Sequence, residues 1–249
     1  MNSKMSHLPL ELRQLHKSYG QVHAVNGVDL QVNPAEVFGL LGPNGAGKTS
    51  IISVITGLEK PTSGEVKVFG ADVSKDPRHA KMLVGRVPQE IVSHGFFNVE
   101  EVLGFLAGYY GVRDSKDRIA FLLDRLSLTQ HKHKKVNQLS GGMKRRLMIA
   151  KALIHQPKLL LLDEPTAGVD VELRNSLWKF VGELKAQGVS ILLTTHYLEE
   201  AQKLCDRVAI IHFGKIRAMG PTQQVISDIT QKSDASLEDA YLLLTQDKK

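Results

Sequence analysis

The sequence is poor in cysteine and in long apolar runs. Its single cysteine, Cys205, excludes an internal disulfide and a cysteine-based zinc site, which favours a reducing compartment. No apolar run approaches the roughly 18 residues that a membrane-spanning helix needs. The N-terminal MNSKMSHLPLEL also lacks the apolar stretch of a signal peptide. We therefore expect a cytoplasmic globular protein.

Cations exceed acids, giving a formal charge of +6, but net charge alone does not distinguish nucleic acid, anionic lipid and nucleotide phosphates as partners. The densest basic run, HKHKK at 131–135, lies between two helical patterns and is interpreted as a solvated loop rather than a nucleic-acid patch. Its two histidines have no Cys, Asp or Glu nearby in the sequence and make a poor metal site. No nucleic-acid partner is expected.

Hydrophobic periodicity predicts an α/β architecture. Short apolar runs in the opening third, such as the alternating stretch 28–32, predict strands. After Gly85 the pattern becomes helical, and we expect a helical lobe at about 90–157. Strands alternating with helices then return, which implies a mainly parallel sheet. We expect one domain over residues 1–220 and a short helical extension over 221–249.

The segment GPNGAGKT has the pattern of a phosphate-binding loop. It follows the apolar strand EVFGLL and precedes the helical SIISVITGL, which is the context such a loop requires. Its glycines allow backbone N–H groups to surround phosphates, Lys48 would meet the β and γ oxygens, and Thr49 would bind Mg²⁺. A bare glycine-rich turn is disfavoured because Lys48 and Thr49 are both in register. The expected nucleotide contacts here are Gly42, Pro43, Asn44, Gly45, Ala46, Gly47, Lys48, Thr49 and Ser50.

Polar residues follow three other predicted strands. LLLLDEP brings Asp163 and Glu164 to the carboxyl end of a buried strand, where ligands of parallel sheets bind. Asp163 would hold Mg²⁺, directly or through water, and Glu164 would deprotonate the water that attacks the γ-phosphate. His196 in LTTHYLEE would reach the γ-phosphate, and Gln89 in VPQE would contact Mg²⁺ or that water. Without further evidence, a structural role for His196 is as well supported as a catalytic one, and the sequence supports a catalytic role for Gln89 only weakly.

A second anion-binding pattern lies in NQLSGGMKRRLMI at 137–149. Ser140 is a good N-cap, and Gly141 and Gly142 leave the first N–H groups of the predicted helix approachable. Since the chain already has a phosphate loop, this helix start is redundant, structural, or suited to a phosphate that another chain brings. The residues alone leave these three possibilities open.

Together these motifs resemble the ATPase subunit of an ATP-binding cassette (ABC) transporter over nearly the whole chain. In order they match the Walker A loop, the Q-loop at Gln89, the signature LSGGM, the Walker B strand LLLLDE, the D-loop AGVD and the switch histidine His196. The resemblance implies a P-loop ATPase fold with a mainly parallel core sheet, an N-terminal antiparallel β part and a helical lobe. It also implies that Tyr19 stacks on adenine and that Asp170 contacts nucleotide.

Two departures from the family pattern touch no phosphate-contacting position. Met143 replaces the usual glutamine of the signature, and Ala35 stands where a glycine is usual. Met143 and its surroundings are similar to members that serve ABC-2-type permeases, including drug and nodulation-factor exporters. The resemblance thus implies an exporter ATPase that uses ATP and Mg²⁺ beneath a separate ABC-2-type permease, on the cytoplasmic face of the membrane.

In this family two ATPase chains pair head to tail. The resemblance therefore implies a dimer, most simply a homodimer, in which Ser140, Gly141 and Gly142 close over the partner's γ-phosphate. A soluble ABC protein acting on ribosomes or DNA is disfavoured by the single cassette and the lack of sustained heptads. A regulator without turnover is disfavoured by Glu164 and His196.

The stretch FFNVEEVLGFLAGYY after Gln89 gathers aromatic and apolar residues, and we expect it to form part of a groove for the permease. A structural interpretation competes, because Asn98 and Glu101 form a capping box with Phe97 and Val102 as its hydrophobic staple. Two short strands are expected at 207–219. Two helices should follow, one after Pro221 and one from a capping box at Ser236 and Asp239.

Overall fold

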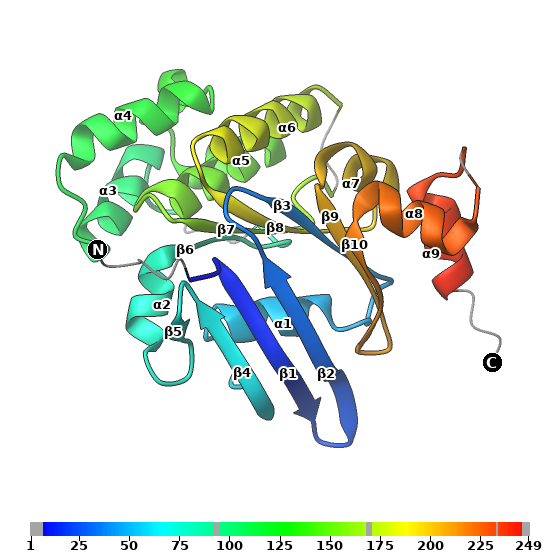
Figure 1. The fold of residues 1–249 in the computed structure, drawn as a ribbon. Coiled ribbons are helices and arrows are strands. Elements are labelled where there is room, and N and C mark those ends of the chain that lie inside the picture. Colours follow the sequence, from blue (N-terminus) through cyan, green and yellow to red (C-terminus); the bar gives the residue numbers. More distant parts are fainter. Residues whose placement is uncertain (1–6, 92–94, 168–170, 233, 246–249) are drawn as a thin grey trace, which may run out of the picture.

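The chain is described by a computed structural model that covers residues 7–91, 95–167, 171–232 and 234–245. Two β-sheets form its framework (Figure 1). The first is antiparallel, with four strands in the order β2-β1-β4-β5. Val28, Leu30 and Val32 are buried on β2, which confirms the alternation predicted there. The strands are β1 (Leu10–Tyr19), β2 (Val22–Val32), β4 (Ser63–Val68) and β5 (Ala71–Asp72).

The second sheet has six strands in the order β10-β9-β3-β8-β7-β6, and only its edge pair β9 and β10 is antiparallel. Every residue of β3, β7 and β8 is buried, as expected for strands covered on both faces. The carboxyl ends of the parallel strands meet at one edge of the sheet. The strands are β3 (Val37–Leu41), β6 (Val84–Val87), β7 (Leu159–Asp163), β8 (Ser190–Thr195), β9 (Arg207–His212) and β10 (Lys215–Pro221).

Helices cover this sheet and build the lobe beside it (Figure 1). The first helix contacts β2 and β4 of the antiparallel sheet and β7 of the other, so it lies between them. The lobe holds α3, α4 and α5 with two short 3₁₀ turns. The helices are α1 (Lys48–Ile55), α2 (Pro77–Leu83), α3 (Val99–Tyr109), α4 (Ser115–Arg125), α5 (Gly141–Leu153), α6 (Val171–Ala186), α7 (Leu198–Leu204), α8 (Thr222–Thr230) and α9 (Leu237–Thr245).

Two hydrophobic cores lie on opposite faces of the six-stranded sheet. Leu160 and Leu162 of β7 pack with the helical lobe and α6, whereas Leu159 and Leu161 pack with α1 and the antiparallel sheet. Cys205 follows α7 and packs so closely on β3 that a Cβ at Gly39 would lie 2.9 Å from its Sγ. Burial raises the pKa of this thiol.

Helix starts agree with the sequence in most places. Asn98 and Glu101 form the expected capping box at α3, and Ser236 and Asp239 exchange the corresponding bonds at α9. The helical pattern does not begin after Gly85, however, because α2 precedes that residue. This helix was missed because it is only 7 residues long and lacks a clear apolar stripe, with Ala80 its one buried residue.

The basic run 131–135 is not a free loop. The backbone carbonyls of Lys132 and Lys134 accept from the N–H groups of Glu100 and Val99 at the start of α3. The Glu100 carboxylate also lies 3.5 Å from Lys132 Nζ and 3.5 Å from His133 Nδ1. Glu100, which is distant in the sequence, is thus brought close to His133 by folding. Within the described ranges, no helix is long and apolar enough to cross a bilayer.

Candidate active site

The predicted phosphate loop joins β3 to α1. Gly47 is the N-cap of α1 with φ 110°, and a Cβ there would lie 2.3 Å from the carbonyl oxygen of Ala24. Gly45 also has a positive φ, of 80°. These two positions require glycine, and the loop therefore brings its backbone N–H groups and the start of α1 to one point, the arrangement that binds anions.

A cavity of about 270 Å³ opens beside this loop. It brings Tyr19 from β1, Gln89 from beyond β6 and Glu164 from beyond β7 to the loop residues. Tyr19 is 45% exposed and has Lys17 Nζ 4.6 Å from its ring centroid. Gly42, Pro43 and Ala46 belong to the loop but do not line the cavity. Its lining residues are Tyr19, Ala24, Asn44, Gly45, Gly47, Lys48, Thr49, Ser50, Gln89 and Glu164.

Lys48 is buried at the base of the loop. Its Nζ donates to the carbonyl oxygens of Gly42 at 2.7 Å and Pro43 at 3.1 Å, and lies 3.9 Å from Glu164 Oε1. Burial lowers the pKa of Lys48, and the charges of Glu164 and Asp163 oppose that shift. The ammonium group is thus held without full solvation, where a phosphate oxygen would be a favourable partner.

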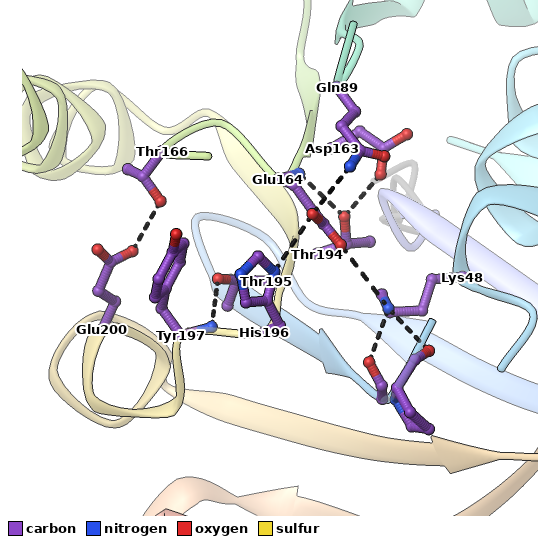
Figure 2. Close-up of polar contacts among 12 residues, drawn as sticks. Lys48, Gln89, Asp163, Glu164, Thr166, Thr194, Thr195, His196, Tyr197 and Glu200 are labelled. Carbon is purple, nitrogen blue, oxygen red and sulfur yellow. Dashed lines mark hydrogen bonds and ion pairs between the residues drawn. The ribbon is translucent and has the colours of Figure 1, made fainter. Parts of the chain in front are cut away.

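Glu164 is the meeting point of the site (Figure 2). Its Oε2 accepts from Gln89 Nε2 at 3.1 Å and lies 3.2 Å from His196 Nδ1. Its backbone N–H donates to the carbonyl oxygen of Thr194, which fixes the residue directly after β7, with φ 46°. The structure therefore brings Lys48, Gln89 and His196 onto the one buried carboxylate of Glu164, although these four residues come from four separate segments.

Asp163, the last residue of β7, is only 2% exposed. Its Oδ1 accepts from Thr194 Oγ1 at 2.8 Å, and its Oδ2 lies 3.6 Å from the Arg86 guanidinium. Among the described residues, no group of three or more His, Cys, Asp or Glu is arranged to hold a metal ion. The oxygens of Asp163 and Thr49 fit Mg²⁺ only as part of a shell completed by water and phosphate oxygens.

The start of α5 is built as expected but stands apart from this cavity. Ser140 Oγ accepts from the backbone N–H of Met143 at 3.3 Å, which confirms the N-cap. Ser140 and Gly141 are exposed, and Gly142 lies within the first turn of the helix. None of these three residues lines the cavity. Asp170 lies outside the described residues.

Three side chains in or beside the site were missed by sequence reasoning. Thr194 and Arg86 hold Asp163, and Arg145 donates to the carbonyl oxygens of Pro88 at 2.8 Å and Gln89 at 2.9 Å. Thr194 carried a signal, because a threonine at the end of an apolar strand meets the other strand ends. Arg86 and Arg145 carried none, since their partners lie on other elements.

Comparison with known proteins agrees with this geometry. The family model described as "ABC transporter" matches residues 25–167. The chain is 42% identical over 224 residues to the Nod factor export ATP-binding protein I of Burkholderia orbicola (strain AU 1054), covering 89% of this chain and 74% of that protein. It is 38% identical over 241 residues to the linearmycin resistance ATP-binding protein LnrL of Bacillus subtilis (strain 168), covering 94% and 78%.

Solved structures give the same result. The fold superposes with a TM-score of 0.89 and 30% identity on the ATP-binding subunit of an ABC transporter, over 94% of this chain and 98% of that one. A nucleotide-free ATP-binding cassette gives a TM-score of 0.79 at 26% identity, over 95% and 99%. The α/β fold with its antiparallel N-terminal sheet is thus as the sequence predicted. From its motifs, its fold and these relatives, the chain belongs to the ABC transporter family, as an ATP-binding subunit.

Proposed function

We propose that this chain hydrolyses ATP with Mg²⁺ and thereby powers export through a separate ABC-2-type membrane permease, to which it binds on the cytoplasmic face of the membrane. The observation that carries the proposal is the convergence of Gln89, His196 and Lys48 on Glu164 at the mouth of the phosphate loop. A buried carboxylate beside a hydrogen-bond donor and a lysine suits water activation near a phosphate better than it suits packing.

In the proposed reaction, Glu164 accepts a proton from the water that attacks the γ-phosphorus, and the bond to the β-γ bridging oxygen breaks, giving ADP and phosphate. Lys48 and the loop N–H groups bind the phosphate oxygens, and Tyr19 stacks on the adenine. Gln89 and His196 hold the carboxylate in place. A Mg²⁺ held near Thr49, Gln89 and Asp163 would neutralise charge on the β and γ oxygens.

A second copy of the chain completes the site in this proposal. Ser140, Gly141 and Gly142 form a capped helix start that lies away from the chain's own cavity. Placed over the γ-phosphate of a partner, this helix start would share one anion with the partner's phosphate loop. ATP would then hold the homodimer together, and hydrolysis would loosen it.

Export is supported by the names of relatives, which describe Nod factor export and linearmycin resistance. The permease has a candidate docking surface in a larger cavity of about 990 Å³, bordered by α2, β6, α3 and α5. Cationic side chains gather there, and no Asp or Glu is among its described lining residues. The cations are Arg78, Lys81, Arg86 and Lys151.

The positive charge of these side chains favours an acidic partner at the docking surface. We therefore assign the cavity to a cytoplasmic segment of the permease that carries acidic side chains among apolar ones. Leu106, Tyr109 and Tyr110 supply the apolar wall, and the Tyr110 ring stacks on His155 at 4.0 Å. Only the later half of the stretch FFNVEEVLGFLAGYY lines the cavity, whereas Phe96 is 89% exposed and outside its described lining.

The proposal is tested with the purified chain, alone and with the membrane protein that co-purifies with it. We expect ATP turnover with Mg²⁺, none with a chelator, ATP-dependent dimerisation in sedimentation, and faster turnover with the permease. ATP binding without turnover in both preparations would contradict the enzymatic proposal and leave a regulator. If no membrane protein co-purifies with the chain, or if the one that does leaves turnover unchanged, the transport proposal is contradicted.

A further inference from the structure

Arg145 is an unusual member of the basic run Lys144–Arg146 in α5. The residue is only 3% exposed, whereas its neighbours Lys144 and Arg146 are half-buried. Burial lowers the pKa of Arg145, and the charge of Asp163 opposes this shift. Burying a guanidinium costs free energy unless it is well bonded, so packing alone gives no reason for an arginine here.

The guanidinium uses two nitrogens on two consecutive carbonyl oxygens. Arg145 NH1 donates to Pro88 at 2.8 Å and NH2 donates to Gln89 at 2.9 Å. Both residues lie just beyond Val87, the last residue of β6, where ladder bonds no longer set the backbone. Because the guanidinium is planar and donates to two carbonyl oxygens at once, it fixes the orientation of the peptide between them. It therefore also fixes the direction in which the Gln89 side chain leaves the backbone.

Gln89 in turn contacts the proposed base. Its Nε2 donates to Glu164 Oε2 at 3.1 Å. A continuous set of hydrogen bonds therefore runs from α5 through Arg145 and Gln89 to Glu164. Because a positioned carboxylate loses effectiveness when it moves by as little as about 1 Å, the tether is well placed to affect turnover.

The same helix reaches two other surfaces. Its start, at Ser140, is the part that we place on the partner's nucleotide, and its later residues Lys151 and Ala152 line the docking cavity. With 13 residues at about 1.5 Å each, α5 is about 20 Å long. Through Arg145 it connects these two surfaces to the Gln89 backbone.

We propose that Arg145 is a positioning residue that ties Gln89, and through it Glu164, to the position of α5. The inference rests on the proposed function, and it adds that the helix covering one nucleotide also sets the geometry of the base at the chain's own nucleotide. Hydrolysis at the two sites of a dimer is then linked through this side chain.

The test is a double-mutant cycle of Arg145→Met with Gln89→Ala. Arg118→Met is the matched control, because Arg118 is also partly buried in the lobe and donates to a backbone carbonyl, that of Leu153 at 2.6 Å. We expect Arg145→Met to lower kcat by about 10- to 100-fold with little change in KM, and Arg118→Met to leave kcat within about twofold. With Gln89→Ala present, Arg145→Met should cost little more.

Two further measurements keep the inference separable from the proposed function. Hydrogen exchange of the peptide that contains Pro88 and Gln89 should speed up in Arg145→Met but not in Arg118→Met, with or without turnover. In the Glu164→Gln background, Arg145→Met should still give the ATP-dependent dimer. Arg145→Lys keeps the positive charge but cannot donate to both carbonyl oxygens in the same planar geometry. This variant should fold normally and recover only part of the kcat.

The inference fails if exchange at the Gln89 amide is unchanged, or if the losses from Arg145→Met and Gln89→Ala simply multiply. It also fails if Arg118→Met lowers kcat equally, since the effect would then come from lobe stability. A parent chain without turnover or ATP-dependent dimer would instead contradict the proposed function, and the exchange result would still decide whether Arg145 orders Gln89.

Discussion

His196 Nδ1 lies 3.2 Å from Glu164 Oε2, the oxygen that also accepts from Gln89. Both side chains meet the Glu164 carboxylate (Figure 2). They come from strand ends on either side of β7, since His196 follows β8 and Gln89 follows β6. One oxygen of Glu164 is thus held by flanking side chains, and Oε1 faces Lys48. The following predictions depend on this arrangement and on the surfaces around it.

Glu164→Gln should abolish most turnover while ATP binding persists. The substitution keeps the size of the side chain and removes the base, a role worth roughly 10²–10⁴-fold. The dimer should then accumulate because ATP stays bound. Binding stabilises the ATP-bound form by about 2.7 kcal/mol at a ligand concentration 100-fold above Kd. Steady-state phosphate release and sedimentation measure the two effects. Glu172→Gln, on the exposed face of α6, is the control, and near-normal turnover in Glu164→Gln would refute the role of Glu164.

Gly142→Asp should separate an intermolecular site from a structural helix cap. Gly142 is helical and is not among the described residues with positive φ, so the backbone tolerates a Cβ. An acid in the first turn usually favours a helix by about 0.3–1 kcal/mol, and the fold should survive. Next to a partner's γ-phosphate the same carboxylate is repulsive, so ATP should bind while dimer and turnover are lost.

Sedimentation of Gly142→Asp combined with Glu164→Gln, with ATP and Mg²⁺, gives the clearest reading. Gly182→Asp is the matched control, because Gly182 is likewise a helical glycine, and a Cβ there meets open space. A strong ATP-dependent dimer of the first double variant would mean that α5 does not cover the partner's nucleotide.

Thr194→Val should weaken the hold on Asp163. The substitution is nearly isosteric and removes the 2.8 Å bond to Oδ1, leaving a buried acceptor short of a donor at a cost of about 1–3 kcal/mol. We expect a lower thermal midpoint and a higher Mg²⁺ requirement for turnover. Thr195→Val removes a different hydroxyl, which accepts from the Tyr197 N–H, and should leave the Mg²⁺ requirement alone. Equal Mg²⁺ dependence in both variants would contradict the role of Thr194.

Tyr109→Asp should impair coupling to the permease and leave the basal turnover of the isolated chain intact. Tyr109 lines the docking cavity and is 80% exposed, so the change should not unfold α3 but should repel an acidic segment. Phe96→Asp tests whether the surface extends beyond the cavity. Phe213→Asp, on the exposed β9–β10 turn, is the control. Unchanged permease-stimulated turnover in Tyr109→Asp would remove the docking assignment.

His155 predicts a pH-dependent stability at the wall of that cavity. Burial lowers its pKa, while its ring stacks on Tyr110 and bonds the Val84 carbonyl. The unfolded chain then binds the proton at a higher pH than the folded chain. The stability that the neutral His155 side chain contributes to the folded state is therefore complete above the ordinary histidine pKa of about 6.5. It is lost as the pH falls toward the lowered pKa of the folded state. In thermal unfolding, His155→Gln should flatten the decline in stability between about pH 7.5 and about pH 5.5. Parallel declines in the parent chain and in His155→Gln would contradict this.

The sequence predicted most of what depends on local order. GPNGAGKT and LLLLDE carry their chemistry in consecutive residues, and the apolar runs around them reveal the strands on which they lie. The strand ends then gather Glu164 and His196 because parallel strands share one edge. What the sequence did not reveal are pairings between distant segments. Arg145 meets Gln89 at a separation of 56 residues, and no pattern in either segment announces that contact.

The burial of Cys205 against Gly39 gives the chain a property useful for labelling. Because the only thiol is buried with a raised pKa, it is almost entirely un-ionised and shielded from alkylating reagents while the sheet is intact. Cysteines introduced elsewhere, for instance on the start of α5, would then be modified alone without first removing the native one. Slow modification of Cys205 itself would report the rate at which the structure around β3 opens.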